Sequence, residues 1–155
     1  LLLGELEPTA GTIMRTGFSY LYIDQECSVI DPRLTVFEQT ERFNTGNWAE
    51  HELKSILNRY LFPYDTWDKG CACLSGGEKI RLLFCCLMIG NNAPDVFILD
   101  EPTNNLDIQS VEIITAAIKS YRGTVLLISH DHYFVKEIKI NRSIKLFDTG
   151  SVIKI

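Results

Sequence analysis

The stretch that decides the fold reads DVFILDEPTNNLDIQSVEIITAAIKSYRGTVLLISHD and occupies residues 95–131. It opens with the continuous apolar run Val96–Leu99 and closes with a second one, Val125–Ile128. Runs this short and this apolar are typical of strands buried on both faces of a parallel sheet. The segment between them, about Ile108–Tyr121, has the length and apolar spacing of a helix. The sequence therefore predicts a strand–helix–strand unit, whose crossover is almost always right-handed.

Polar side chains follow both predicted strands. Asp100 and Glu101 come directly after the first strand, and Ser129 and His130 come directly after the second. The carboxyl ends of parallel strands meet at one edge of a sheet, and open parallel sheets bind their ligands there. We therefore expect the two carboxylates and the imidazole to share one site.

The two adjacent carboxylates predict a bound cation or a polarised water, because like charges are costly to hold side by side. Magnesium with a phosphate fits best, since a strand-end Asp commonly holds the magnesium of a nucleoside triphosphate and a neighbouring Glu can deprotonate water. Pro102 favours an extended backbone at Glu101, so the side chain of Glu101 is expected to project outward. The alternative is that Asp100 and Glu101 cap a loop and that His130 is an ordinary helix-start residue.

A second motif, LSGGEK, occupies residues 74–79. Ser75 and Glu78 have the spacing of a capping box at the start of a helix. Glycine is a poor helix former, so Gly76 and Gly77 need a reason other than helix stability. We interpret them as leaving bare backbone amides at a helix N-terminus, where a phosphate can approach closely. The alternative is a capped helix start with flexible glycines.

The remaining chain reads as packing elements. Thr35 and Glu38 form a possible capping box for a helix that ends near Phe43, and Asp31-Pro32 marks a loop. The other expected elements are a helix over Ala49–Leu61, strands over Thr12–Arg15 and Phe18–Ile23, and a helix end at Leu1–Leu6.

Composition narrows the class of protein. The 155 residues fit one domain, and 15 Lys and Arg against 20 Asp and Glu give a net charge of −5. That balance does not by itself suggest a nucleic-acid surface, because phosphate neutralisation needs clustered cations that this chain lacks, and we expect any electrostatic RNA binding to lie elsewhere. No apolar run reaches the roughly 18 residues of a membrane span, and no secretory leader is visible. The five irregularly spaced cysteines predict free thiols in a reducing cytosol, because no metal-ligand spacing is present.

Three motifs together resemble the ATP-binding cassette (ABC) ATPases: LSGGEK at 74–79, DVFILDEPTNNLD at 95–107 and SHDHYFV at 129–135. Three details resemble the ABC-F class of this family: the sequence EPTNNLD, the aromatic pair after SHD, and SGGEK in place of the SGGQ that is usual in transporters. Members of that class are soluble tandem-cassette ATPases that act on the ribosome in translation, and some confer resistance to ribosome-targeting antibiotics. The resemblance implies an α/β, P-loop NTPase-like cassette in the cytoplasm. It would have a mostly parallel sheet, N-terminal β-strands and a helical subdomain at about 33–90.

The resemblance also implies roles at the site, with ATP and Mg²⁺ as cofactors. Gln25 would be the Q-loop glutamine that reaches the magnesium and the attacking water. Asp100 would be the magnesium-site aspartate, Glu101 the catalytic base, and His130 the residue that senses the γ-phosphate.

A further set of residues would serve a second cassette, since ABC enzymes complete two ATP sites head to tail. Ser75, Gly76, Gly77 and Glu78 would face ATP held by the opposite cassette, and Asp107 belongs to the loop that crosses between paired cassettes. No GxxxxGKS or GxxxxGKT phosphate loop occurs in the chain. The resemblance therefore implies that 1–155 is a single partial cassette that begins just after that loop.

Three functions stay open from the sequence. The first is an ABC-F ATPase that engages the ribosome. The second is the nucleotide-binding subunit of a membrane transporter, against which the EPTNNLD and SGGEK variants argue. The third is a catalytically silent fragment that supplies only the LSGG half of a partner's site.

Overall fold

The computed structural model of the chain describes residues 3–4, 6–14, 16–24, 27–90, 93–104, 106–146 and 152–154. Its central element is a sheet of three parallel strands in the order β1-β2-β3. These strands are β1 (Tyr20–Ile23), β2 (Val96–Asp100) and β3 (Thr124–Ile128). Helix α4 (Ile108–Ser120) connects β2 to β3. The predicted strand–helix–strand unit is therefore confirmed, and both strands run in the same direction.

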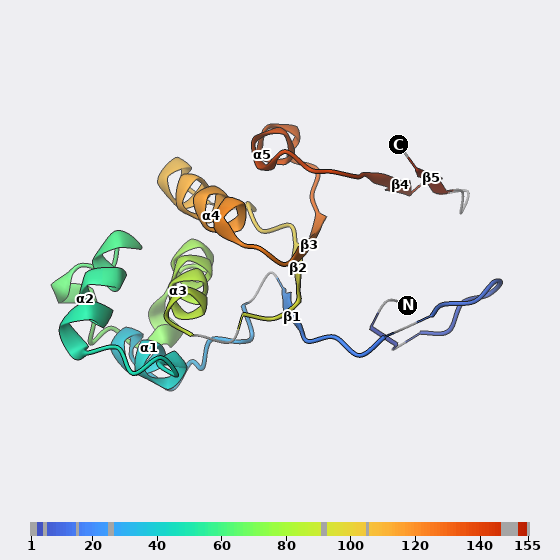
Figure 1. The fold of residues 1–155 in the computed structure, drawn as a ribbon. Helices are drawn as coiled ribbons and strands as arrows, with labels where there is room; N and C mark the ends of the chain where they lie inside the picture. The colour runs from blue at the N-terminus through green and yellow to red at the C-terminus, as the bar shows by residue number, and fades with distance from the viewer. Residues whose placement is uncertain are drawn as a thin grey trace.

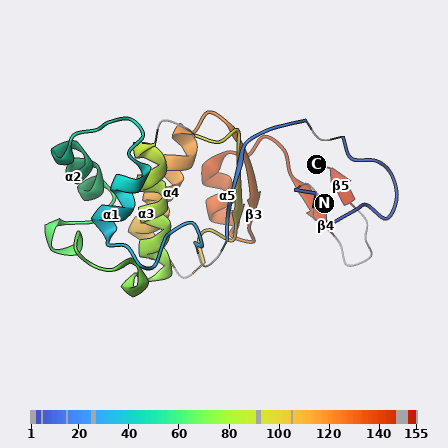
Figure 2. The ribbon, with the colours of Figure 1, turned by 90° about the horizontal axis from the view of Figure 1, so that it is seen from below.

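A group of helices fills the predicted helical region between β1 and β2. It consists of α1 (Val36–Phe43), α2 (Glu50–Arg59) and α3 (Gly76–Ile89), with short 3₁₀ turns at Tyr64–Thr66 and Cys71–Cys73. Figures 1 and 2 show this group at one end of the molecule, with α3 between the outer helices and the sheet. At the other end lies an antiparallel hairpin of β4 (Ile144–Leu146) and β5 (Val152–Lys154). Helix α5 (His132–Ile138) follows β3.

Helix α3 is the centre of the core. Side chains on every side of it are buried, which is typical of a helix surrounded by other elements. It packs against α1, α2 and α4 and against one face of the sheet, where Ile23, Phe97 and Leu99 are buried. On the opposite face Tyr20, Tyr22 and Ile128 are exposed. Because α3 is rigidly packed, its first turn is held in a fixed position relative to the sheet.

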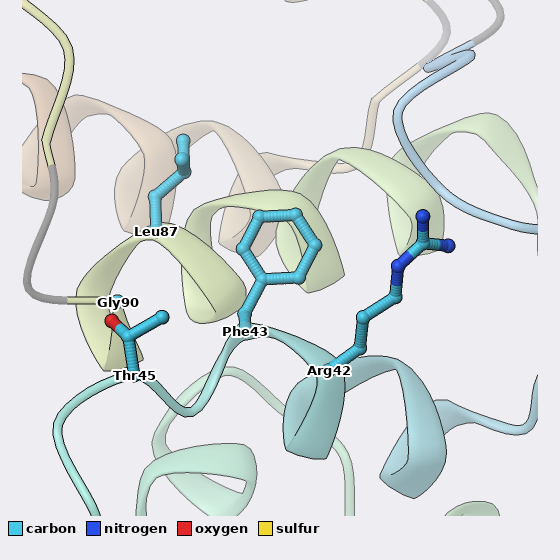
Figure 3. Close-up of a pocket in the computed structure, with 5 residues that line it drawn as sticks. All are labelled: Arg42, Phe43, Thr45, Leu87 and Gly90. Atoms are coloured by element: carbon cyan, nitrogen blue, oxygen red, sulfur yellow. The ribbon is translucent and has the colours of Figure 1, made fainter.

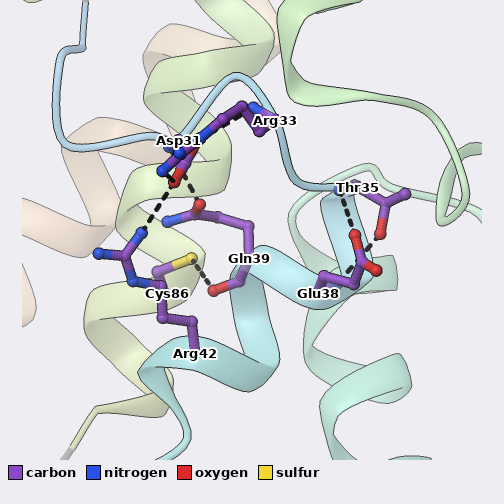
Figure 4. Close-up of polar contacts among 7 residues, drawn as sticks. All are labelled: Asp31, Arg33, Thr35, Glu38, Gln39, Arg42 and Cys86. Carbon is purple, nitrogen blue, oxygen red and sulfur yellow. Dashed lines mark hydrogen bonds and ion pairs between the residues drawn. The ribbon is translucent and has the colours of Figure 1, made fainter.

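Asp31 ties the loop after β1 to α1. Its carboxylate accepts hydrogen bonds from Arg33 (Nη2, 2.7 Å) and Arg42 (Nη1, 3.3 Å), and its backbone N–H donates to Oε1 of Gln39 (3.1 Å) (Figure 4). The predicted capping box of Thr35 and Glu38 is confirmed, since each residue's side chain accepts from the other's backbone N–H. These contacts fix the point where the chain leaves the sheet for the helices.

Two predictions near the N-terminus are wrong. The described residues of the predicted strand Thr12–Arg15 are not in a strand, because no neighbouring strand offers them backbone partners. Among the described N-terminal residues, only β1 represents the expected strands. Residues 3, 4 and 6 form turns and bends instead of a helix end, and Gly4 has a left-handed φ of 88°. The other residues of 1–6 lie outside the described ranges.

The expectation of free thiols agrees with the structure. The cysteines Cys27, Cys71, Cys73, Cys85 and Cys86 are all free, and only Cys73 is exposed. Burial raises the pKa of the Cys27 and Cys71 thiols to about 11, so both stay protonated at neutral pH. Among the described residues no cluster of His, Cys, Asp or Glu could hold a metal by itself, and no helix has the length and hydropathy of a membrane span.

Candidate active site

The carboxyl edge of the sheet brings the predicted acids and the predicted imidazole together. The register pairs Asp100 with Ile128, so β2 and β3 end side by side. The backbone N–H of Glu101 donates to the carbonyl of Ile128 (2.9 Å), which continues the strand pairing by one residue. Oε1 of Glu101 then lies 2.8 Å from Nδ1 of His130. The expected juxtaposition is therefore confirmed for Glu101 and His130 at hydrogen-bond distance, with Asp100 next to Glu101 at the same strand end.

All three strands contribute to this edge. The hydroxyl of Tyr22, on β1, donates to Oδ2 of Asp100 (3.0 Å). Sequence reasoning missed Tyr22, because only the parallel register that pairs Tyr22 with Ile98 brings it near the end of β2. No local motif marks the residue.

The backbone of Glu101 departs from the prediction. Its φ of 47° lies in the left-handed region, whereas Pro102 favours an extended residue. The hydrogen bond to Ile128 and the turn in which the N–H of Asn104 donates to the carbonyl of Glu101 (3.2 Å) override that preference. A left-handed backbone costs a residue with a side chain about 1–2 kcal/mol, and such strain is concentrated at functional sites.

The side chain of Glu101 also lies differently from the expectation. It does not project outward, since only 18% of it is exposed. Oε1 contacts His130, but Oε2 is buried and has no hydrogen-bond partner in the described part of the chain. A buried carboxylate oxygen without a partner is unfavourable, so it indicates a place where a cation or a proton donor binds.

His130 completes the edge from the solvent side. Its side chain is 77% exposed, which leaves Nε2 free to reach a ligand. The hydrogen bond to Glu101 and the negative charge of that carboxylate raise the pKa of His130 above its ordinary value. The imidazole therefore keeps its proton to a higher pH than an isolated histidine does.

The first turn of α3 is organised by its capping box. Oγ of Ser75 accepts from the N–H of Glu78 (3.2 Å), and Oε2 of Glu78 accepts from the N–H of Ser75 (2.8 Å). Oε1 of Glu78 accepts from Nζ of Lys69 (2.9 Å). Burial raises the pKa of Glu78, but the hydrogen bonds from Lys69 and Ser75 outweigh it, and the net shift is downward. The predicted capping box is confirmed, and both carboxylate oxygens of Glu78 are engaged within the chain.

The two glycines of this turn have different surroundings. Gly76 is exposed, and a Cβ built on it would meet no atom within 4 Å. Gly77 is buried, and its Cβ would lie 2.9 Å from Cδ2 of Leu106 and 3.8 Å from Oγ of Ser110. The interpretation that glycine leaves the amides accessible fits Gly76. It does not account for Gly77, which is small because the loop before α4 packs against it.

Asp107 is the N-cap of α4. Its Oδ1 accepts from the N–H of Ser110 (2.8 Å) and its Oδ2 from the hydroxyl of Ser110 (2.9 Å). These two hydrogen bonds lower the pKa of Asp107. The carboxylate therefore holds the loop at 106–107 in place, and that loop is the one that contacts Gly77.

Gln25 lies outside the described residues. The next described residues, Cys27 and Ser28, line a pocket of about 480 Å³ together with Gly76 and Lys79. A second pocket, of about 280 Å³, lies at the opposite end of α3 (Figure 3). This second pocket is lined by Arg42, Phe43, Thr45, Leu87 and Gly90. None of them is a predicted site residue.

This arrangement defines a class of protein. Parallel strands deliver an Asp-Glu pair and a histidine to one edge, and a helical region ends in a helix that begins at SGGE. That is the architecture of an ATP-binding cassette. The family model described as "ABC transporter" matches residues 1–104, and the chain belongs to this family.

The relatives narrow the class further. The chain is 39% identical to "ABC transporter F family member 5" and 38% identical to "ABC transporter F family member 2", both of Arabidopsis thaliana. The alignments cover 96% and 97% of this chain but 21% and 22% of those proteins, so the chain spans about a fifth of their length. The resemblance to the ABC-F class is confirmed.

A solved structure agrees with the fold. The archaeal ribosome recycling factor in complex with an archaeal ribosomal stalk protein superposes with a TM-score of 0.68 and 25% identity. The match covers 92% of this chain and 28% of that one. The predicted fold class is therefore confirmed.

Proposed function

We propose that the chain is part of an ABC-F ATPase of the cytoplasm that hydrolyses ATP with Mg²⁺ and acts on the ribosome in translation. The observation that carries the proposal is the pairing of Glu101 with His130 beside Asp100 at one sheet edge. The similarity to F family members, and to a ribosome recycling factor solved with a ribosomal stalk protein, supports the part of the proposal that concerns translation.

The residues at the edge fit a magnesium–phosphate group. Mg²⁺ prefers oxygen ligands, and the buried Oε2 of Glu101 is an acceptor without a partner in the described part of the chain. Asp100 would hold the ion, which when bound would neutralise charge on the phosphates. Glu101 would accept a proton from the attacking water at its carboxylate, while His130 would hold that carboxylate and face the γ-phosphate.

The first turn of α3 would serve a second cassette. Ser75 and Gly76 are exposed, and the bare amides of the turn would donate to ATP held by the partner. Glu78 would support this contact by holding the turn in shape. Gln25 would belong to the same nucleotide site as Asp100, and Asp107 and Gly77 would fix the loop that runs toward the partner.

The test of the catalytic arm is Glu101→Gln in the full-length protein. The amide keeps the size of the side chain but cannot take a proton from water, so ATP turnover at this site should fall by about 10²-fold or more. Glu112→Gln, on the exposed side of α4, is the matched control and should leave turnover unchanged. Undiminished turnover in Glu101→Gln would remove Glu101 as the base.

The test of the translation arm is co-sedimentation of the full-length protein with purified ribosomes and with membrane vesicles. Binding to ribosomes in the presence of a non-hydrolysable ATP analogue supports the proposal. Binding to membranes alone would instead support the transporter subunit.

A further inference from the structure

Charge is unevenly distributed along this acidic chain. Five of the fifteen Lys and Arg residues but two of the twenty Asp and Glu residues lie in 132–155, which gives that segment a net charge of +3. Residues 1–131 carry −8. The overall balance, which predicted no nucleic-acid surface, therefore hides a cationic segment at one end of the sequence.

Helix α5 and its C-cap display two of these cations, together with a histidine, on one face. His132, Lys136 and Lys139 recur at i, i+4 and i+7, which places them on one side of a helix. All three are exposed, whereas Phe134 and Ile138 face the core from the other side. Figure 1 shows α5 at the margin of the molecule, beyond α4 and β3. We call the exposed side, with His132, Lys136 and Lys139, the basic face of α5.

The acids near this face are already engaged. Asp131 caps α5 by accepting from the N–H groups of Tyr133 and Phe134. Glu137 forms an ion pair with Lys119 of α4 (3.1 Å). In contrast, Lys136, Lys139 and the exposed Arg142 form no ion pair with any residue that the structure describes. Three cations are therefore available to an external anion.

Two further features indicate that the face is used. Lys139 sits in the left-handed conformation at the C-cap (φ of 57°), where glycine is the favoured residue. The strain is explained if a cation is needed at that position. Tyr133, which precedes Lys136 by three residues on the helix, is 73% exposed, and an exposed aromatic ring next to cations is the combination that stacks on unpaired bases.

We propose that the basic face of α5 is an RNA-binding surface that contacts the phosphate backbone of ribosomal RNA, with Tyr133 against an unpaired base. The inference rests on the proposed function, because it assigns the surface through which this cassette would meet the ribosome. RNA is the partner that fits, since a chain with −8 elsewhere is repelled by phosphate except along this segment.

The experiment measures binding of the full-length protein to purified ribosomes, with a non-hydrolysable ATP analogue, at several salt concentrations. Lys136→Gln/Lys139→Gly removes two cations, and glycine suits the left-handed position, so a folding defect is not expected. Affinity should fall about tenfold, and the slope of log affinity against log salt should shrink by about two. Arg59→Gln/Arg122→Gln removes two exposed cations elsewhere and should leave the affinity within twofold.

A photoreactive phenylalanine in place of Tyr133 identifies the contacted molecule. Cross-links to ribosomal RNA support the inference, and cross-links only to ribosomal protein would overturn it. It would equally be overturned if the double variant bound with unchanged affinity and salt slope, in which case ribosome binding itself would stand. If the unmodified protein did not bind ribosomes, the proposed function would fall and this inference with it.

Discussion

The carboxyl edge of the sheet and the first turn of α3 both carry predicted site residues, but they use their polar groups in opposite ways. At the edge, Oε2 of Glu101 has no partner in the described part of the chain, and His130 is largely exposed. In the first turn of α3, Ser75 and both carboxylate oxygens of Glu78 already form hydrogen bonds within the capping box and with Lys69.

The difference separates two kinds of ligand contact. The edge has side-chain groups left for chemistry, so it is suited to holding an ion and moving a proton. The turn has only its backbone amides and the space beside Gly76 left, so it is suited to contacting a phosphate without reacting with it. Substitutions should therefore change function at the edge through side-chain chemistry and at the turn through volume.

The largest effect is expected for Glu101→Gly. Glycine tolerates the left-handed φ and removes the buried carboxylate oxygen, so the free energy of unfolding should rise by about 1 kcal/mol. ATP turnover of the full-length protein should fall by about 10²-fold or more, because the base is lost. Amide hydrogen exchange of β2 measures the stability, and phosphate release measures the turnover.

Glu101→Gln is the control for this trade-off. It loses the base and the charged partner of His130 but keeps the left-handed residue, so at a pH where His130 is neutral its unfolding free energy should stay near that of the unmodified protein. If Glu101→Gly were less stable than Glu101→Gln, the backbone at the edge would not be strained and the contrast with the α3 turn would weaken.

A smaller effect distinguishes the two glycines of the turn. Gly76→Val adds its methyl groups to open space, so the unfolding free energy should change by less than about 0.5 kcal/mol. Turnover should still fall about tenfold, because the side chain would stand where the partner's phosphate approaches. Gly77→Val forces methyl groups against Leu106 and should cost about 1–3 kcal/mol of stability.

Hydrogen exchange of α3 and α4 and ATP turnover, measured on both variants, check this pair. Equal destabilisation by the two valines would show that Gly76 is also a packing glycine. Normal turnover in Gly76→Val would contradict the assignment of this turn to a partner's nucleotide.

The features that local sequence rules govern could be predicted. The strands of the strand–helix–strand unit are marked by short apolar runs, and the capping boxes of Thr35 and Ser75 by a side chain three residues from its partner. The shared edge of Glu101 and His130 follows from the parallel direction of β2 and β3. Each of these depends on contacts within a few residues or on a general rule of chain topology.

The features that depend on contacts between residues far apart in the sequence could not be predicted. The left-handed φ of Glu101 arises because its N–H bonds to Ile128, a tertiary contact that overrides the effect of the next residue. Gly77 is small because Leu106, far along the chain, packs against it. Tyr22 reaches Asp100 only through the strand register. The strand expected at Thr12–Arg15 had a suitable sequence, but its described residues have no strand to pair with in the part of the chain that the structure describes.

The smallest effect concerns the proton on His130. Because Glu101 raises the pKa of His130, the NMR titration of this imidazole should have its midpoint above the ordinary value of 6.5. The stabilisation from the pair is then complete below pH 6.5 and is lost as the pH rises through the folded-state pKa. Glu101→Gln should return the midpoint toward 6.5, whereas Glu112→Gln on α4 should not move it. If the titration midpoint of His130 were the same in the unmodified protein and in Glu101→Gln, the Glu101–His130 pair would not persist in solution. The edge would then lack the arrangement that distinguishes it from the α3 turn.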